Sequence, residues 1–108
     1  MEIKINVYED DMKTVKKEVI AETTDIPFGV IRRFMNLFNV KDFNDTSEVF
    51  NVITSCWGQI TRLLNIIFPD MTEEDFDTVK TKELINVVIN VLKYSFKEML
   101  EIPVDQKN

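Results

Sequence analysis

The sequence predicts an α+β fold that is mainly helical, with an N-terminal β-hairpin packed on about four α-helices. Three observations support this prediction. Apolar and polar residues alternate near the N-terminus, and apolar residues recur at spacings of three and four over most of the remaining chain. A chain of 108 residues with only 2 Gly and 3 Pro can also bury one hydrophobic core. We therefore expect a single domain over residues 1–108.

The β-hairpin is predicted at about residues 2–22. Every second residue from Ile3 to Val7 is apolar, which is the period of a strand with one buried face. The same alternation runs from Val15 to Ala21, with Lys17 as the one break on the apolar face. The intervening turn lacks Asn-Gly or Asp-Gly, so we expect a loose connection of several residues. Two strands alone are marginally stable, so the hairpin must lie on the helices or extend the sheet of another chain.

Helices are predicted at about residues 26–38, 46–68, 73–79 and 82–101. Residues 23–25 offer side-chain oxygens to cap the first helix, and Pro27 is tolerated in its first turn. Residues 45–48 have the pattern of a capping box, which predicts the start of the second helix. Thr72 with Asp75 predicts the start of the third helix. The last helix is more apolar than one face requires. It is therefore expected to be central to the fold or covered on a second side by another chain.

Two residues of the second predicted helix, Cys56 and Trp57, lie in its apolar register. Cys56 is the one cysteine, so it forms no internal disulfide, and we expect a small core residue. If Trp57 lies on the buried face of this helix, then Trp57→Ala should cost about 3 to 5 kcal/mol.

The residue types argue against catalysis. The chain has no His, the commonest general base near neutral pH and the commonest metal ligand. Its adjacent acids, Asp10 with Asp11 and residues 73–75, are typical of a solvated turn and of the first turn of a helix. The sequence has no Gly-rich phosphate loop, CxxC or GxSxG motif. We expect no catalytic residues, no cofactor and no metal site, and therefore no enzyme.

Charge and hydropathy restrict the partners and the location. A formal net charge of -6 argues against nucleic acid as a partner, because affinity for phosphates comes mainly from Lys and Arg. No apolar run reaches 18 residues and no signal peptide is visible, so we expect a cytosolic protein without a membrane partner.

Binding of another protein is the class of function that remains. The chain has 8 Phe, 1 Trp and 2 Tyr, which is enough to supply aromatic side chains to a contact surface as well as to a core. Phe38, Phe43 and Phe50 flank or lie in the polar stretch at residues 39–45. We predict that these three residues bind a partner.

Three segments carry a resemblance to a known family. They are "MEIKINVYEDDMKTVKKEVIAETTDIPFG", "IFPDMTEEDFDTVKTKELINVV" and "KYSFKEMLEIP". Together they resemble the short tail assembly chaperones of long-tailed, siphovirus-type phages and prophages of Firmicutes. The most specific part is "FPDMTEEDFDTVKTKELI" at residues 68–85, followed at a fixed distance by "YSF".

The resemblance implies a non-enzymatic protein that binds the tape measure protein, keeps it soluble and helps recruit tail tube subunits. It implies a location in the host bacterial cytoplasm and absence from the mature virion. It also implies self-association, and a longer frameshifted product whose extension binds the tube protein. Without the resemblance, the residues support only a small α+β interaction domain. Two alternatives stay open, a structural tail or connector component and an acidic phage-encoded inhibitor of a host nucleic-acid enzyme.

Overall fold

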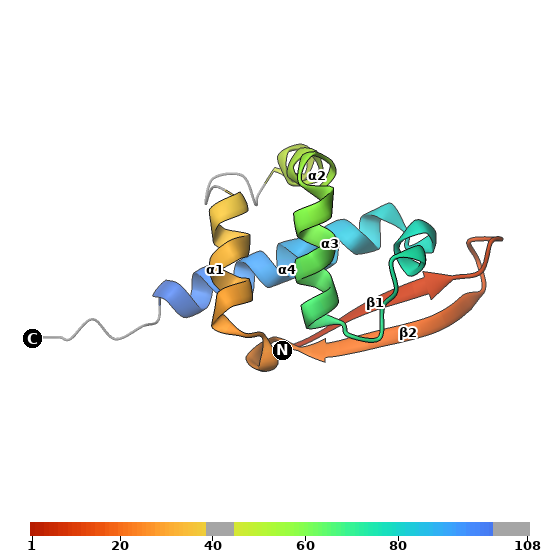
Figure 1. Cartoon of the computed structure of the whole chain (residues 1–108), viewed down its shortest axis with the longest axis horizontal. Helices are drawn as coiled ribbons and strands as arrows, with labels where there is room; N and C mark the ends of the chain where they lie inside the picture. Colours follow the sequence, from red (N-terminus) through yellow and green to blue (C-terminus); the bar gives the residue numbers. More distant parts are fainter. Residues whose placement is uncertain (39–44, 101–108) are drawn as a thin grey trace, which may run out of the picture.

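The structure, a computed structural model, describes residues 1–38 and 45–100, with the backbone alone at residues 98–100. Its elements follow the predicted order of a hairpin and then helices, so the α+β, mainly helical class is confirmed (Figure 1). The elements are β1 (Glu2–Tyr8), β2 (Val15–Glu22), η1 (Thr23–Asp25), α1 (Phe28–Leu37), α2 (Thr46–Ser55), α3 (Trp57–Ile67), η3 (Glu74–Thr78) and α4 (Thr81–Leu100).

Strands β1 and β2 form the predicted antiparallel hairpin. Ile3 pairs with Ala21 and Ile5 with Val19, which places the alternating apolar residues on one face. The register shifts after Val7, next to the turn.

The hairpin turn is long, as predicted, and it is held by the side chain of Asp11. The Asp11 carboxylate accepts hydrogen bonds from the backbone N–H of Lys13 at 2.8 Å and of Thr14 at 2.9 Å, and from the Thr14 hydroxyl at 2.7 Å. Met12 takes the left-handed conformation at φ 58°, which a multi-residue turn of this kind requires at one position.

The hairpin packs on the helices of its own chain, which is the first of the two expected arrangements. β1 contacts α4 and η3, and Val7 forms an isolated β-bridge with Val79 just before α4 (Figure 1). Ile3, Ile5 and Val19 are buried in the common core. The hydrophobic face of the hairpin is therefore covered within one chain.

Lys17 breaks the apolar face of β2 because it reaches an acidic partner. Its Nζ lies 2.7 Å from Oδ2 of Asp75 and donates a hydrogen bond of 2.7 Å to the carbonyl oxygen of Asp70. The ion pair joins the hairpin to the segment around η3.

The first helix starts differently from the prediction. Thr23 to Asp25 form the short helix η1 instead of capping α1, which begins after Pro27 without a side-chain cap. The Thr23 side chain is buried, and its hydroxyl donates a hydrogen bond to the carbonyl oxygen of Met1 at 3.0 Å. The Thr23 hydroxyl therefore links the end of β2 to the start of the chain and closes the open end of the hairpin.

The prediction of one helix over residues 46–68 is wrong, because the chain bends at Cys56. Asp45 caps α2 as predicted and accepts hydrogen bonds from the backbone N–H of Ser47 and Glu48. Cys56 then leaves the helical region at φ -114° and ψ 30°, and its carbonyl oxygen accepts the first bonds of α3. As a result α2 and α3 point in different directions (Figure 1). Both helices still bury apolar side chains, Val49 and Ile53 on α2, and Ile60, Leu63, Leu64 and Ile67 on α3.

The predicted helix at residues 73–79 is the 3-10 helix η3. Thr72 and Asp75 form the expected reciprocal pair: the Thr72 N–H donates to the Asp75 carboxylate at 2.8 Å, and the Asp75 N–H donates to the Thr72 hydroxyl at 3.3 Å.

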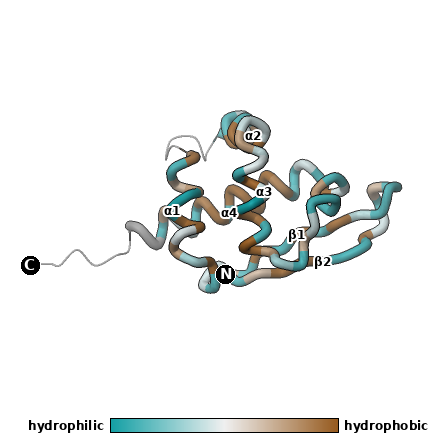
Figure 2. The backbone as a smooth tube through the Cα atoms, viewed as in Figure 1, coloured by the Kyte–Doolittle hydropathy of each residue, from teal (hydrophilic) through white to brown (hydrophobic). Residues whose placement is uncertain are grey.

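Helix α4 is central to the fold, which explains its excess of apolar residues. It passes behind α1 and α3 in Figure 1 and contacts α1, α2 and β1. Figure 2 shows hydrophobic residues along the middle of α4, where α1 and α3 cross it. Val87, Val88, Val91 and Leu92 are at most 3% exposed. Over Thr81–Lys97, no large apolar side chain of α4 is left exposed for another chain to cover.

Candidate functional site

The described part of the chain holds little that could support metal chemistry. No group of three or more His, Cys, Asp or Glu within residues 1–38 and 45–100 could hold a metal ion. In the same residues, no helix has the length and apolar character needed to span a membrane. The same residues form surface hollows and leave several large apolar side chains exposed.

The three predicted partner-binding residues have different outcomes. Phe38 is only 3% exposed and stacks on Phe34 with ring centroids 6.4 Å apart, so its prediction as a contact residue is wrong. It follows Phe34 by four residues and thus continues the buried stripe of α1 into the core. Phe43 lies outside the described residues. Phe50 on α2 is 42% exposed and stays a prediction.

Trp57 is more exposed than its place in the apolar register indicates. Its side chain is 37% exposed and meets the ring of Phe76 edge-to-face, with centroids 5.8 Å apart. It is one of several exposed large apolar side chains among the described residues, which come from the N-terminus, β2, α1, α2 and α3. They are Met1, Val15, Ile20, Phe28, Phe50, Trp57 and Ile66.

A groove of about 640 Å³ lies between α1 and α3. It is lined by Arg33, Asn36 and Leu37 from α1, and by Gln59, Arg62 and Leu63 from α3. In both helices the spacing is i, i+3 and i+4, so each helix contributes one continuous strip of its surface. We call this site the α1–α3 groove.

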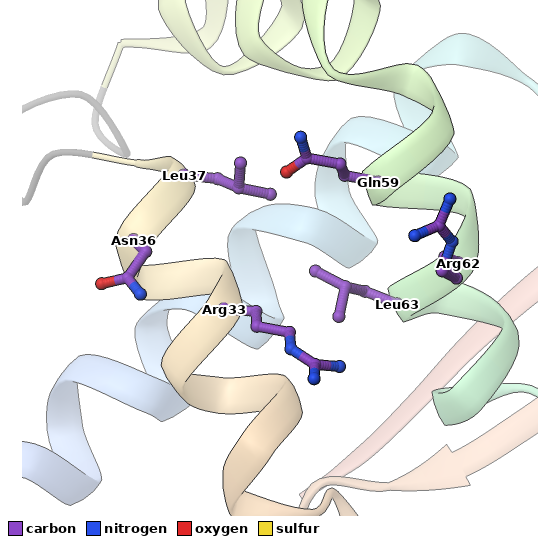
Figure 3. A pocket seen from close by; sticks show the side chains of 6 residues that line it. All are labelled: Arg33, Asn36, Leu37, Gln59, Arg62 and Leu63. Atoms are coloured by element: carbon purple, nitrogen blue, oxygen red, sulfur yellow. The ribbon is translucent and has the colours of Figure 1, made fainter.

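The side chains of the α1–α3 groove form an apolar base under a polar rim. In Figure 3, Arg33 and Leu37 extend from α1 toward α3. Gln59 and Leu63 extend from α3 in the opposite direction (Figure 3). Leu63 is buried, whereas the two arginines and the two amides are exposed. A ligand in this groove would contact leucine side chains below and hydrogen-bond donors above.

The α1–α3 groove is basic in a protein that is acidic overall. Arg33 and Arg62 line it and no acidic side chain does, although the formal net charge of the chain is -6. Among the described residues, neither guanidinium has a carboxylate within ion-pair distance. Two guanidinium groups without acidic partners favour a ligand that carries carboxylates.

A second hollow, of about 420 Å³, has the opposite charge. It lies where the hairpin turn meets η3, and its lining includes five acidic side chains. The lining residues are Tyr8, Glu9, Asp10, Lys16, Glu74, Asp75, Asp77 and Thr78. Of these acids, Asp75 forms an ion pair with Lys17.

Hydrogen bonds with Glu83 fix the end of β1 next to this hollow. The Tyr8 hydroxyl donates to the Glu83 carboxylate, which also accepts from the backbone N–H of Asn6 at 3.4 Å. The bond to Glu83 raises the pKa of Tyr8 above its ordinary value. The Lys80 ammonium lies 4.5 Å from the centre of the Tyr8 ring, within cation–π range. These contacts hold the hairpin firmly on the first turn of α4.

Sequence reasoning missed the α1–α3 groove, although one signal was available. The three arginines, Arg32, Arg33 and Arg62, lie on α1 and α3, whereas the other basic residues are lysines. Arg is the residue that binds carboxylates in a fixed bidentate geometry. A search for arginine at matching helix positions would have selected these two helices.

Comparisons with known proteins do not add to this description: no protein-family model, curated protein or solved structure matches the chain.

Proposed function

We propose that this protein is a non-enzymatic phage tail assembly chaperone that binds the tape measure protein, keeps it soluble and helps recruit tail tube subunits. The host bacterial cytoplasm is then its place of action, and it is absent from the mature virion. The observation that carries the proposal is the resemblance of the three sequence segments, above all residues 68–85.

Residues 68–85, the most specific part of the resemblance, connect the hairpin to the helices in this fold. The apolar side chains of Phe68, Met71, Phe76 and Val79 are buried in the core. One acidic residue of the same segment, Asp75, binds Lys17 of the hairpin. A segment with these contacts sets the position of the hairpin on the helices, so its sequence is under structural constraint in any protein that shares the fold.

The exposed apolar side chains support a protein-binding role. Phe28 on α1 is 74% exposed and Phe50 on α2 is 42% exposed, so both rings are available to a partner. A long helical protein such as a tape measure presents apolar stripes, and exposed aromatic side chains are the usual anchors for such stripes.

Co-expression with a tape measure fragment tests the proposal. The fragment should be insoluble alone and soluble with the protein, and the double variant Phe28→Ser, Phe50→Ser should reduce the soluble fraction. A matched control is Thr24→Ser with Asn51→Ser, which changes exposed polar residues next to the same elements. A fragment that stays insoluble in the presence of the wild-type protein would contradict the proposal.

Two further measurements separate the chaperone from a structural tail component. Mass spectrometry of purified particles should find no copy of this protein, since a structural component must be present in them. Intact-mass analysis of protein expressed from the native gene with its downstream DNA should show a minor, longer product that shares this N-terminal domain.

A further inference from the structure

We propose that the α1–α3 groove of one copy of this protein binds the acidic hairpin turn of a second copy. The acidic hairpin turn is residues 9–14, in which Glu9, Asp10 and Asp11 outnumber the one basic residue, Lys13. The inference goes beyond the proposed function, which names only other proteins as partners. The choice of surfaces comes from charge, shape and hydrogen bonding in this chain.

The two surfaces are complementary in charge. The groove presents Arg33 and Arg62 without an acidic side chain in its lining. The turn presents Glu9 and Asp10, which are exposed, and neither carboxylate is in an ion pair among the described residues. Pairing of guanidinium groups with carboxylates would satisfy both sides through charge-assisted hydrogen bonds.

The two surfaces are also complementary in apolar character. Leu37 and Leu63 form the base of the groove. The turn carries Met12, which is half-buried, and it leads into Val15, which is 48% exposed. An acidic turn with apolar neighbours thus meets a basic rim with an apolar base.

Hydrogen bonds within the turn hold its shape without a partner, and such preorganisation lowers the entropic cost of association. The Glu9 N–H donates to the Thr14 carbonyl oxygen at 2.8 Å, and the Met12 N–H donates to the Glu9 carbonyl oxygen at 2.8 Å. The Asp11 carboxylate accepts from both the backbone N–H and the hydroxyl of Thr14. Asp11 is therefore occupied within the turn, and Glu9 and Asp10 remain to face a partner.

The groove and the turn lie on different parts of the molecule, so one chain cannot close the contact on itself. In Figure 1 the turn projects from the body beyond η3, on the side away from α1. A contact between unlike surfaces of identical chains can repeat head-to-tail, which gives rings or open chains, or it can be made twice across a two-fold axis. In either case the contact needs a second copy of the chain.

Paired charge reversals test this contact. The groove variant is Arg33→Glu with Arg62→Glu, and the turn variant is Glu9→Lys with Asp10→Lys. Sedimentation velocity over a range of concentrations should show association of the wild type, and each variant alone should bind itself at least about tenfold more weakly. Mixing the two variants should restore association, because an acidic groove then meets a basic turn while the native pair is also present.

Controls separate this contact from general charge effects. Each variant shifts the formal net charge of -6 by four units, so both stay acidic and do not attract each other through net charge. Lys93→Glu with Lys97→Glu on the exposed side of α4 applies the same shift as the groove variant and should leave association unchanged. If a charge-reversed variant fails to fold, Arg33→Gln with Arg62→Gln and Glu9→Gln with Asp10→Asn are the milder substitutions, and each pair should still weaken association.

The outcomes distinguish this inference from the proposed function. A wild type that stays monomeric, a variant that associates like the wild type, or a mixture without restored association would each overturn the inference. If the wild type is monomeric but the groove variant no longer solubilises the tape measure fragment, then the occupant of the groove is the partner and not a second copy. If association follows the predicted pattern but the fragment stays insoluble, the contact holds and the chaperone function fails.

Discussion

Asp75 is a nearly buried carboxylate that connects η3 to the hairpin. Burial by itself raises the pKa of Asp75, but hydrogen bonds from Lys17 and Thr72, together with the charge of Lys17, outweigh it and lower the pKa below its ordinary value. A carboxyl whose pKa is lower in the folded chain stabilises the fold above its unfolded pKa of about 3.9. This contribution is lost as the pH falls through the lower, folded pKa.

Asp75→Asn should therefore destabilise the protein in a pH-dependent way. At pH 7 we expect a loss of about 1.5 to 3 kcal/mol in the free energy of unfolding, because hydrogen bonds to a charged group are lost. The difference from wild type should stay constant down to about pH 5 and shrink below about pH 4. Urea unfolding at several pH values measures this difference in the free energy of unfolding. Asp77→Asn, at an exposed acid of the same helix, is the control and should have little effect; equal losses in both variants would contradict the role of Asp75.

Phe34 and Trp57 should differ strongly in their contribution to stability. Phe34 is 0% exposed, so Phe34→Ala should cost about 3 to 5 kcal/mol. Trp57→Ala should cost only about 1 to 2 kcal/mol, because the ring is partly exposed and loses mainly its contact with Phe76. Unfolding followed by far-UV circular dichroism measures both, since Trp57 is the only tryptophan. A Trp57→Ala loss as large as that of Phe34→Ala would indicate that Trp57 is covered in solution.

At the scale of elements, the bend at Cys56 shows what apolar periodicity can miss. The apolar spacing continues across Cys56 because both α2 and α3 bury one face against the same core. Apolar periodicity indicates which residues are buried, but it does not indicate whether the helix axis is straight. Gly58, one residue into α3, was the available local signal, since Gly disfavours a continuous helix.

Gly58→Ala should stabilise the protein without straightening the bend. A Cβ atom at this position meets no other atom within 4 Å, and the φ angle is not positive. Alanine also has fewer conformations to lose on folding, so we expect a gain of about 0.4 to 1 kcal/mol and a rise in Tm of a few degrees. Differential scanning calorimetry measures the shift, with Gly29→Ala in α1, which is equally unobstructed, as a second instance. A lower Tm for Gly58→Ala alone would mean that the bend needs glycine.

For the whole molecule, the buried residues of the hairpin and of all the helices belong to one core. The cluster contains Ile5 and Val19 from the hairpin, Phe34 from α1, Leu64 from α3 and Val88 from α4. Unfolding should therefore be a single cooperative transition. Urea curves followed by Trp57 fluorescence and by far-UV circular dichroism should have the same midpoint. A separate early transition in one of the two signals would show that part of the chain unfolds independently.

The fold could be predicted from the sequence further than the candidate site could. Strand alternation and the capping residues Asp45 and Thr72 are local signals, and the structure contains the hairpin and helix starts that they predict. The burial of Phe38 follows from a local pattern, since it lies four residues after Phe34 in the apolar stripe of α1. The α1–α3 groove instead depends on how α1 is placed against α3, which no local pattern specifies. Apolar spacing places Arg33 outside the buried stripe of α1, but it does not place this residue opposite α3.

The open edge of β2 affects how the protein behaves at high concentration. Among the described residues no strand pairs with the outer edge of β2, which leaves a row of backbone groups that could recruit a further strand. The same strand carries Lys16, Glu18 and Glu22 on its outer face, and charges of this kind oppose edge-to-edge pairing. The protein should therefore resist conversion into amyloid-like fibres.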